Sequence, residues 1–201
     1  MAYPHVLAPL TPSSAAVLLA AGGGTRFAGT EHKLLTTVGG RLLIEHAVGN
    51  VTESGLTPIL VVTGAADLTS VLPTSVVAIV NEDWESGQAT SLAVAVDWAR
   101  SLDPTEFDAI VVGLADQPGI SPSAWRAVAA TTNTPMAVAT YGGVRGHPVR
   151  LHRDVWDRLP RIGDAGARPV MARWPELVTE VACDGDPSDV DTVEDLRHWP
   201  S

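Results

Sequence analysis

The chain has 201 residues, 45% of them hydrophobic and 18% charged, and its formal net charge is −10 at pH 7. These values predict one globular domain, residues 15–201, after a short flexible tail, residues 1–14. They exclude a membrane span, since no apolar run reaches ~18 residues, and the acidic balance disfavours nucleic acid as a partner. A single cysteine, Cys183, excludes an internal disulfide and suits a reducing compartment. Residues 1–14 contain no basic stretch of the kind that begins a signal peptide, so the predicted location is the cytoplasm.

Short apolar runs alternate with helical patterns along the chain. The predicted strands are residues 15–21, 58–62, 76–80, 107–114, 136–140 and 177–182. The predicted helices are residues 42–48, 65–71, 88–100, 122–130, 152–159, 165–174 and 193–198. Glycines and a proline within residues 141–151 indicate a β-hairpin or a crossed arm. This alternation predicts an α/β fold with a largely parallel sheet.

The first predicted strand runs into three glycines, Gly22 to Gly24, with Arg26 and Lys33 close behind. Glycine lets backbone N–H groups turn towards an anion, and the two cations suit phosphate oxygens, so the stretch predicts a polyphosphate site. It is not a P-loop, because the chain has no Gly-Lys pair, and Phe27 breaks the dinucleotide fingerprint. The alternative is an ordinary glycine turn with solvated cations.

Two aspartates are candidate metal ligands. Asp116 directly follows the predicted strand 107–114, at the sheet edge where ligands gather in open α/β folds. Asp191 lies in the run Asp189-Val-Asp-Thr-Val-Glu-Asp, close to the end of the chain. Mg²⁺ is typically held by one or two carboxylates together with substrate phosphates. The alternative for Asp116 is a solvated or capping residue, and for Asp191 it is that Asp191 or Thr192 caps the last helix.

Two further loops are candidates for substrate contacts. Gly87 makes a turn into the predicted helix 88–100, whose N-terminus would present free N–H groups to an anion. Residues 163–168, Gly-Asp-Ala-Gly-Ala-Arg, form a turn into a helix with Arg168 one turn in, able to reach a phosphate; the alternative is a C-cap glycine and a surface arginine. His147 is a candidate substrate contact, and the other five histidines, none at metal-ligand spacing, are expected at the surface or in packing.

The motifs occur in an order that resembles the molybdenum cofactor cytidylyltransferases, a branch of the MobA-like nucleotidyltransferases. Leu-Ala-Ala-Gly-Gly-Gly-Thr-Arg-Phe resembles the opening motif Ala-Ala-Gly-x-Ser-x-Arg-Met, with Phe27 in place of Met and an Arg-to-Lys interval longer by about two residues. Asp-Gln-Pro, Gly-His-Pro, Gly-Asp-Ala-Gly-Ala-Arg and the run around Asp191 follow. In Asn-Glu-Asp-Trp-Glu-Ser-Gly-Gln, Gln88 replaces the family's Met.

The resemblance implies a three-layer α/β/α sandwich of the Rossmann-like nucleotidyltransferase (GT-A) type and a set of site residues. The implied catalytic residues are Arg26, Lys33 and Asp116, and the implied metal ligands for Mg²⁺ are Asp116 and Asp191, with Asp189 as a possible helper. The implied nucleotide-binding residues are Ala20, Ala21, Gly22, Gly23, Gly24, Thr25, Arg26, Lys33, Asn81, Gly87, Ser91 and Asp116. The implied acceptor-binding residues are Gln117, Gly146, His147, Pro148, Asp164 and Arg168.

The activity that the resemblance implies is transfer of CMP from CTP to the terminal phosphate of a molybdopterin-type cofactor, with release of pyrophosphate. A molybdenum hydroxylase would then receive the product. Leu-Ala-Ala-Gly, where guanylyl relatives have Leu-Ala-Gly-Gly, favours CTP over GTP. The alternatives are a nucleotidyltransferase for GTP or for another phosphorylated acceptor, and a cofactor chaperone without turnover.

Overall fold

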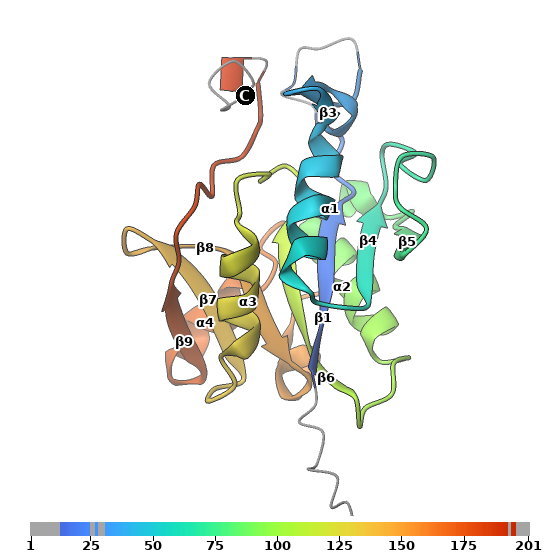
Figure 1. Ribbon diagram of the computed structural model, residues 1–201. Helices are drawn as coiled ribbons and strands as arrows, with labels where there is room; N and C mark the ends of the chain where they lie inside the picture. The colour runs from blue at the N-terminus through green and yellow to red at the C-terminus, as the bar shows by residue number, and fades with distance from the viewer. Residues whose placement is uncertain (1–12, 25–26, 28–30, 193, 196–201) are drawn as a thin grey trace, which may run out of the picture.

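Seven strands form one sheet in the order β5-β4-β1-β6-β8-β7-β9, in a computed structural model that describes residues 13–24, 27, 31–192 and 194–195 (Figure 1). The strands are β1 (Ser13–Ala20), β4 (Ile59–Thr63), β5 (Val76–Val80), β6 (Phe107–Leu114), β7 (Met136–Tyr141), β8 (Val144–His152) and β9 (Val178–Ala182). The short strands β2 (Thr37–Val38) and β3 (Arg41–Leu42) pair separately.

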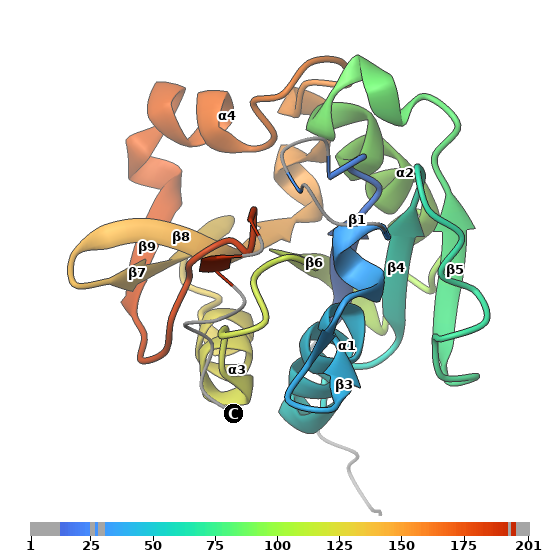
Figure 2. The ribbon, with the colours of Figure 1, turned by 90° about the horizontal axis from the view of Figure 1, so that it is seen from above.

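Helices cover both faces of this sheet, which gives three layers (Figure 2). On one face lie α1 (Leu43–Ser54) and α3 (Pro122–Ala130), and on the other lie α2 (Gln88–Ala99) and α4 (Arg168–Arg173). The short 3₁₀ segments are η1 (Lys33–Leu35), η2 (Trp84–Ser86), η3 (Arg153–Arg158) and η4 (Pro175–Leu177). The expected α/β/α sandwich with a mostly parallel sheet is therefore confirmed.

The core has two halves because the central strands are apolar on both faces. In β1, Leu18 packs with α1 and α3, while its neighbour Val17 packs with α2 and α4. Gly113 in β6 makes room for Trp125 of α3, since a Cβ there would lie 2.6 Å from the indole ring. Trp125 is 1% exposed. Burial on two sides explains why these strands appear in the sequence as unbroken hydrophobic runs.

Strand direction decides where a site can form. β1 pairs in parallel with both β4 and β6, so their carboxyl ends share the upper edge of the sheet in Figure 1. β8 is antiparallel to both of its neighbours, β6 and β7. The predicted β-hairpin is therefore confirmed as β7–β8, and its tip also reaches the upper edge.

Some predicted boundaries are wrong. β1 starts at Ser13, inside the expected tail, and α1 continues to Ser54 because Val51 is fully buried, which outweighs its modest helix propensity. The predicted helix 65–71 does not form: the Asp67 carboxylate accepts the Thr69 N–H, a local bond that competes with a helix. Residues 153–158 are 3₁₀ rather than α-helical, and α4 begins only at Arg168.

The predicted closing helix, residues 193–198, falls largely outside the described residues, although Glu194 and Asp195 have helical backbone. In the part of the chain that the structure describes, no helix combines the length and the apolar character that crossing a membrane requires.

Candidate active site

Two adjoining cavities open at the carboxyl edge of the sheet. The first, which we call the glycine-loop cavity, measures about 400 Å³. It is lined by Leu19, Ala20, Ala21, Gly22, Gly23, Gly24, Lys33, Leu34, Trp84, Glu85, Gly87, Gln88, Ser91, Leu114, Ala115, Asp116, Asp164, Asp189 and Asp191. The second, the hairpin cavity, measures about 660 Å³ and lies between α2, α4 and the β7–β8 hairpin. Leu19, Gln88, Leu114 and Asp189 line both cavities.

Lys33 lies between two carboxylates in the glycine-loop cavity. Its Nζ atom is 2.6 Å from Asp116 Oδ2 and 3.1 Å from Asp191 Oδ1, and the residue is only 8% exposed. Burial alone would lower the pKa of Lys33, but attraction and hydrogen bonds to Asp116 and Asp191 raise it above its ordinary value. The ammonium is therefore charged at neutral pH and balances part of the negative charge of the two aspartates.

The C-terminal segment brings Asp191 to Asp116 by running back along the loop after β6. The Val190 N–H donates to Asp116 O at 2.8 Å, and the Asp186 N–H donates to Gly119 O at 3.2 Å. Val190 itself is 1% exposed and packs into the core. Backbone pairing and one buried valine thus anchor Asp191, although it lies 158 residues from Lys33 in the sequence.

Capping at the end of the chain involves the Thr192 side chain. Thr192 Oγ1 accepts the Asp195 N–H at 3.2 Å, and Asp195 Oδ2 accepts the Thr192 N–H at 2.7 Å, a reciprocal arrangement typical of a capping box. Of the two residues considered as caps, Thr192 supplies the side chain that caps, while the Asp191 carboxylate contacts Lys33.

Asp189 is held at the boundary between the cavities by Gln117. Gln117 Nε2 donates to Asp189 Oδ1 at 2.7 Å and to Pro187 O at 2.9 Å. Gln117 Oε1 is buried and has no hydrogen-bond partner among the described residues. Burial and the nearby charge of Asp116 raise the pKa of Asp189.

The hairpin cavity has a largely apolar floor and polar groups at its rim. Val112, Val138, Val149 and Leu151 form the floor on the sheet, and His147 and Arg168 belong to the lining. Burial lowers the pKa of His147 to about 4, while Asp116 opposes this shift and Arg168 adds to it. His147 is therefore a neutral imidazole at neutral pH, and Arg168 is an exposed cation beside it.

The loop before α2 differs from the prediction in two ways. Asn81 is 2% exposed, and its amide donates to Thr90 Oγ1 and Ser91 Oγ at 2.8 and 2.9 Å, so it supports the loop from beneath and does not line either cavity. At the N-terminus of α2, the Ala89 N–H is not free for an anion, because it donates to Gly163 O at 2.8 Å.

Gly87 permits this docking of the 163–168 loop on α2. A Cβ at Gly87 would lie 2.5 Å from Gly163 C and 2.6 Å from Asp164 Oδ1, and its φ of 104° disfavours other residues. The docked loop places Asp164 in the glycine-loop cavity rather than with the acceptor residues, where it was predicted. Arg168 starts α4 rather than following one turn into a helix.

The remaining predicted residues divide clearly. Those that line the glycine-loop cavity are Ala20, Ala21, Gly22, Gly23, Gly24, Lys33, Gly87, Ser91, Asp116 and Asp191. Gln117, Gly146, His147 and Arg168 line the hairpin cavity. Pro148 is buried in β8 and lines neither cavity. Thr25 and the predicted catalytic Arg26 lie outside the described residues.

The sequence did not reveal that His32 lies at the glycine loop or that Gln88 lines both cavities. His32 was expected at the surface or in packing, but its Nε2 atom lies 2.9 Å from Gly22 O, directly at the glycine loop. The signal available was its place immediately before Lys33. Gln88 was noted only as a replacement for Met, whereas the structure places it on both cavities.

The donor set suits a divalent cation that also contacts phosphate. Two carboxylates converge within 3.1 Å of one positive charge, the Lys33 ammonium. Among the described residues, no group of three or more His, Cys, Asp or Glu side chains is placed to hold a metal ion. A cation here would therefore take other ligands from water and substrate phosphates, as Mg²⁺ commonly does.

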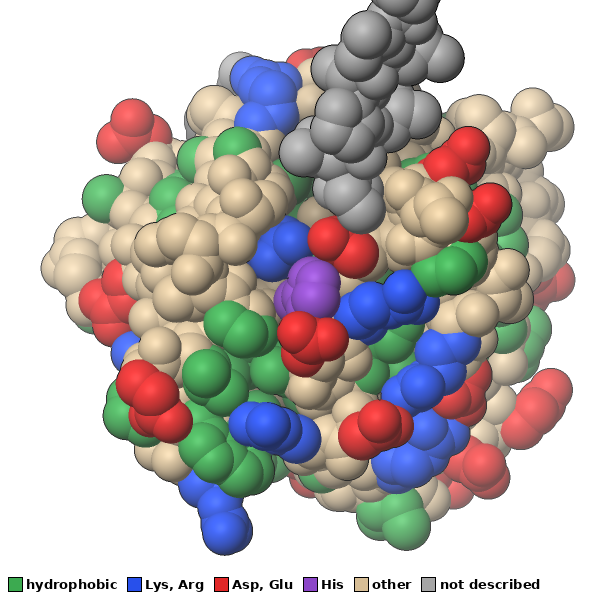
Figure 3. All heavy atoms as spheres, turned by 90° about the horizontal axis from the view of Figure 1, so that it is seen from below, with side chains coloured by type: hydrophobic (Ala, Val, Ile, Leu, Met, Phe, Trp, Pro, Cys, Tyr) green, Lys and Arg blue, Asp and Glu red, His purple; other side chains and the backbone are tan. Residues whose placement is uncertain are grey.

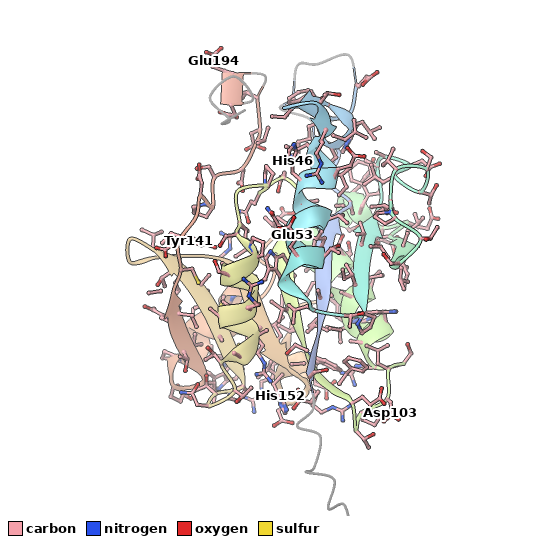
Figure 4. All side chains as sticks on the ribbon, in the orientation of Figure 1. His46, Glu53, Asp103, Tyr141, His152 and Glu194 are labelled. Atoms are coloured by element: carbon pink, nitrogen blue, oxygen red, sulfur yellow. The ribbon has the colours of Figure 1, made fainter. Side chains whose placement is uncertain are left out.

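The described residues at the opposite end of the sheet have a different arrangement of charges. Figure 3 shows acidic and basic side chains interspersed on that face. His152 lies there, at the same end of the molecule as Asp103 and at the opposite end from Glu194 (Figure 4), and its nitrogens are 3.5 Å from Asp108 Oδ2 and 3.2 Å from Asp154 Oδ2. We therefore place the candidate active site at the carboxyl edge.

Solved structures share this architecture. A homologue of Mycobacterium tuberculosis Rv0371c from Mycobacterium sp. strain JC1 is 29% identical, with a TM-score of 0.76 over 92% of this chain and 93% of its own. Rv0371c in complex with manganese is 26% identical, with a TM-score of 0.73 over 92% and 96%. A nucleotidyl transferase from Methanothermobacter thermautotrophicus, 22% identical, has the same fold, with a TM-score of 0.75 over 91% and 94%.

A search of curated proteins finds no match. The sequence signature of the MobA-like NTP transferase domain, however, matches residues 16–178, from β1 to the start of β9. This span includes the glycine loop, Lys33, Asp116, the loop before α2 and the 163–168 loop. The chain therefore belongs to the MobA-like NTP transferase domain family.

Proposed function

We propose that this nucleotidyltransferase moves CMP from CTP to the terminal phosphate of a molybdopterin-type cofactor, with Mg²⁺ as cofactor and pyrophosphate as leaving group. The observation that carries the proposal is the contact of Lys33 with Asp116 and Asp191 inside a cavity walled by glycines. Glycine backbone and a buried ammonium bind phosphate, and paired carboxylates bind the cation that accompanies it. A second cavity directly beside the first leaves room for an acceptor.

The nucleotide would bind with its phosphates along the glycine loop. Gly22, Gly23 and Gly24 line the cavity and can approach phosphate oxygens closely, since they carry no side chain. Lys33 would neutralise charge on the leaving pyrophosphate, and we assign the same role to Arg26. Ser91 and Gly87 on the opposite wall would contact the nucleoside.

Asp116 and Asp191 would hold Mg²⁺, which would supply positive charge to offset the negative charge that develops on the phosphates during transfer. Manganese in the complex of the 26% identical relative supports a divalent cation for this family. Asp189 is engaged by Gln117 at 2.7 Å. We therefore assign it to the boundary between the substrates and not to the pair of ligands.

The acceptor would occupy the hairpin cavity with its phosphate towards Leu19, Gln88 and Leu114, which line both cavities. One acceptor phosphate oxygen forms a bond to the α-phosphorus of the nucleotide while the bond from the α-phosphorus to the bridging oxygen breaks. Pyrophosphate leaves with the electron pair. The attacking phosphate is already ionised, so alignment and charge neutralisation suffice and no general base is needed.

The rim of the hairpin cavity supports a phosphorylated acceptor. Arg168 supplies a cation, the neutral His147 can donate or accept a hydrogen bond, and a donor from the acceptor would satisfy the buried Gln117 Oε1. The apolar floor suits the flat body of a ring system. The choice of a pterin and of a molybdenum hydroxylase as recipient are proposals that rest on the sequence resemblance. The cytoplasm as compartment is a proposal that rests on the single cysteine and the composition of the N-terminal residues.

Pyrophosphate release tests the proposal. The protein is incubated with Mg²⁺, molybdopterin cofactor and CTP, GTP or ATP in parallel, with EDTA as the control. Release with CTP alone supports the full proposal, whereas release with GTP refutes the choice of base. Silence with every nucleotide, followed by release with a sugar phosphate or phospholactate as acceptor, would overturn the choice of acceptor. Tight cofactor binding without any release would favour the chaperone.

A further inference from the structure

The His32 side chain joins the glycine loop to the segment that carries Lys33. Its Nε2 atom lies 2.9 Å from Gly22 O, and its Nδ1 atom accepts the Leu34 N–H at 3.3 Å. A carbonyl oxygen only accepts and an N–H only donates, so the proton of the imidazole must be on Nε2. The His32 ring therefore donates through Nε2 to the glycine loop and accepts through Nδ1 from η1.

The bond to Gly22 determines the direction of a neighbouring donor. In a planar trans peptide, the C=O of one residue and the N–H of the next point in opposite directions. Holding the Gly22 carbonyl on the imidazole therefore directs the Gly23 N–H away from His32. Gly22 and Gly23 both line the glycine-loop cavity, so this N–H is a candidate donor to a phosphate oxygen.

The bond from the Leu34 N–H to the His32 ring fixes the start of η1, and with it the position of Lys33. His32 is the N-cap of η1, and Lys33 is the first residue of that helix. A Cβ at Gly24 would lie 3.3 Å from Lys33 Cγ and 3.7 Å from His32 Nε2, so the lysine stem and the ring both pack over a glycine. One imidazole thus orients the loop and the lysine together.

We propose that His32 is a positioning residue of the phosphate-binding site: it holds the Gly22–Gly23 peptide so that the Gly23 N–H faces the triphosphate. This inference rests on the proposed function, because it assumes that a nucleoside triphosphate binds along the glycine loop. If His32 served only to cap η1, its bond to Leu34 would matter and its bond to Gly22 would not.

Two substitutions separate these roles, because each amide copies one ring nitrogen. His32→Gln places an NH₂ group near the position of Nε2 and can still donate to Gly22 O. His32→Asn places its oxygen near the position of Nδ1 and can still cap η1, but it does not reach Gly22. Asparagine is also among the best capping residues, so His32→Asn is expected to fold.

The measurement is the Kd for CTP and for CMP with Mg²⁺, together with KM and kcat for pyrophosphate release. We expect His32→Asn to bind CTP about fivefold to tenfold more weakly, the loss of one hydrogen bond, with CMP binding and the acceptor KM unchanged. We expect His32→Gln to stay within about threefold of the parent protein for CTP. His46→Asn is the matched control, since His46 Nε2 also lies 2.9 Å from a backbone carbonyl, that of Val38, outside both cavities.

The opposite ranking would overturn the inference: His32→Asn equal to the parent protein, with weakened CTP binding in His32→Gln, is the pattern of a cap alone. CTP binding as tight in both variants as in the parent protein would also overturn the inference, and in that case only this inference is lost. If the parent protein binds no nucleoside triphosphate, the proposed function is lost with it.

Discussion

Replacing Lys33 with methionine should make the protein less stable and yet a better binder of divalent metal. Lys33→Met keeps most of the volume of the buried stem but removes the charge between Asp116 and Asp191. Without the ammonium, Asp116 and Asp191 lose the positive charge that Lys33 places between them. A divalent cation would then restore the balance, and it would no longer compete with the lysine for the same oxygens.

The expected magnitudes follow from burial. Removing one partner of a fully buried ion pair costs about 3–5 kcal/mol. The two aspartate side chains are 22% exposed, so water offsets part of this cost and we expect about 2–3 kcal/mol, or roughly 5–10 °C in melting temperature. The pKa of Lys33 is raised, so its contribution is complete below its unfolded pKa of about 10.4 and is lost only as pH rises further.

Thermal unfolding in EDTA and titration with Mn²⁺ alone, both near neutral pH, measure these effects. We expect Lys33→Met to bind Mn²⁺ about tenfold more tightly than the parent protein, equivalent to about 1.4 kcal/mol, and to regain stability on binding. Arg161→Met is the control: it breaks an exposed pair with Asp97, 2.6 Å long, and should cost less than about 1 kcal/mol. Unchanged or weaker Mn²⁺ binding in Lys33→Met would refute the inference that the Lys33 ammonium and the metal ion compete for the same carboxylate oxygens.

Three further predictions concern His147, Gly87 and Thr192. The pKa of His147 is lowered to about 4, so as pH falls the unfolded state binds a proton on this side chain before the folded state does. The parent protein therefore loses stability between about pH 6.5 and about pH 4, by up to about 1.4 kcal/mol per pH unit. His147→Gln lacks this proton uptake and should lose less stability than the parent protein over the same range, as measured by urea unfolding. Gly87→Ala should undock the Gly163 loop and abolish nucleotide binding, whereas Gly55→Ala, with φ of 79° and no atom within 4 Å of the added Cβ, should cost only about 1 kcal/mol and leave binding intact. Thr192→Val should remove the cap near Asp191 and cost about 1 kcal/mol in thermal unfolding; equal melting temperatures would count against the capping assignment.

The fold was largely predictable because its strands are buried on both faces. Residues 107–114 and 122–130 were predicted with the bounds that β6 and α3 have. A strand in the middle of a parallel sheet is apolar throughout, and Ser121 followed by Pro122 is a clear helix start. The wrong helix at 65–71 shows the limit, since two hydrogen bonds from Thr69 to the Asp67 carboxylate outweighed the helical pattern.

The site was less predictable because its groups come from distant segments. Asp116 and the glycine loop follow neighbouring strands, so topology alone brings them together. Asp191 reaches them through backbone pairing of an irregular segment, which no periodicity reveals. Asn81 illustrates the opposite error: a polar residue next to a predicted ligand loop uses its whole amide inside the protein. A motif specifies which residues are near a site, but side-chain partners decide which of them face it.

Single-turnover release of pyrophosphate by Asp116→Asn tests the central claim most directly. The substitution keeps the size of the side chain and removes the charge that would hold Mg²⁺ and that attracts Lys33. With saturating CTP, Mg²⁺ and acceptor, we expect the rate to fall by at least about a hundredfold while the protein remains folded, as is typical when a group that stabilises transition-state charge is lost. A rate within about threefold of the parent protein would contradict the assignment of the Lys33, Asp116 and Asp191 cluster as the site of transfer.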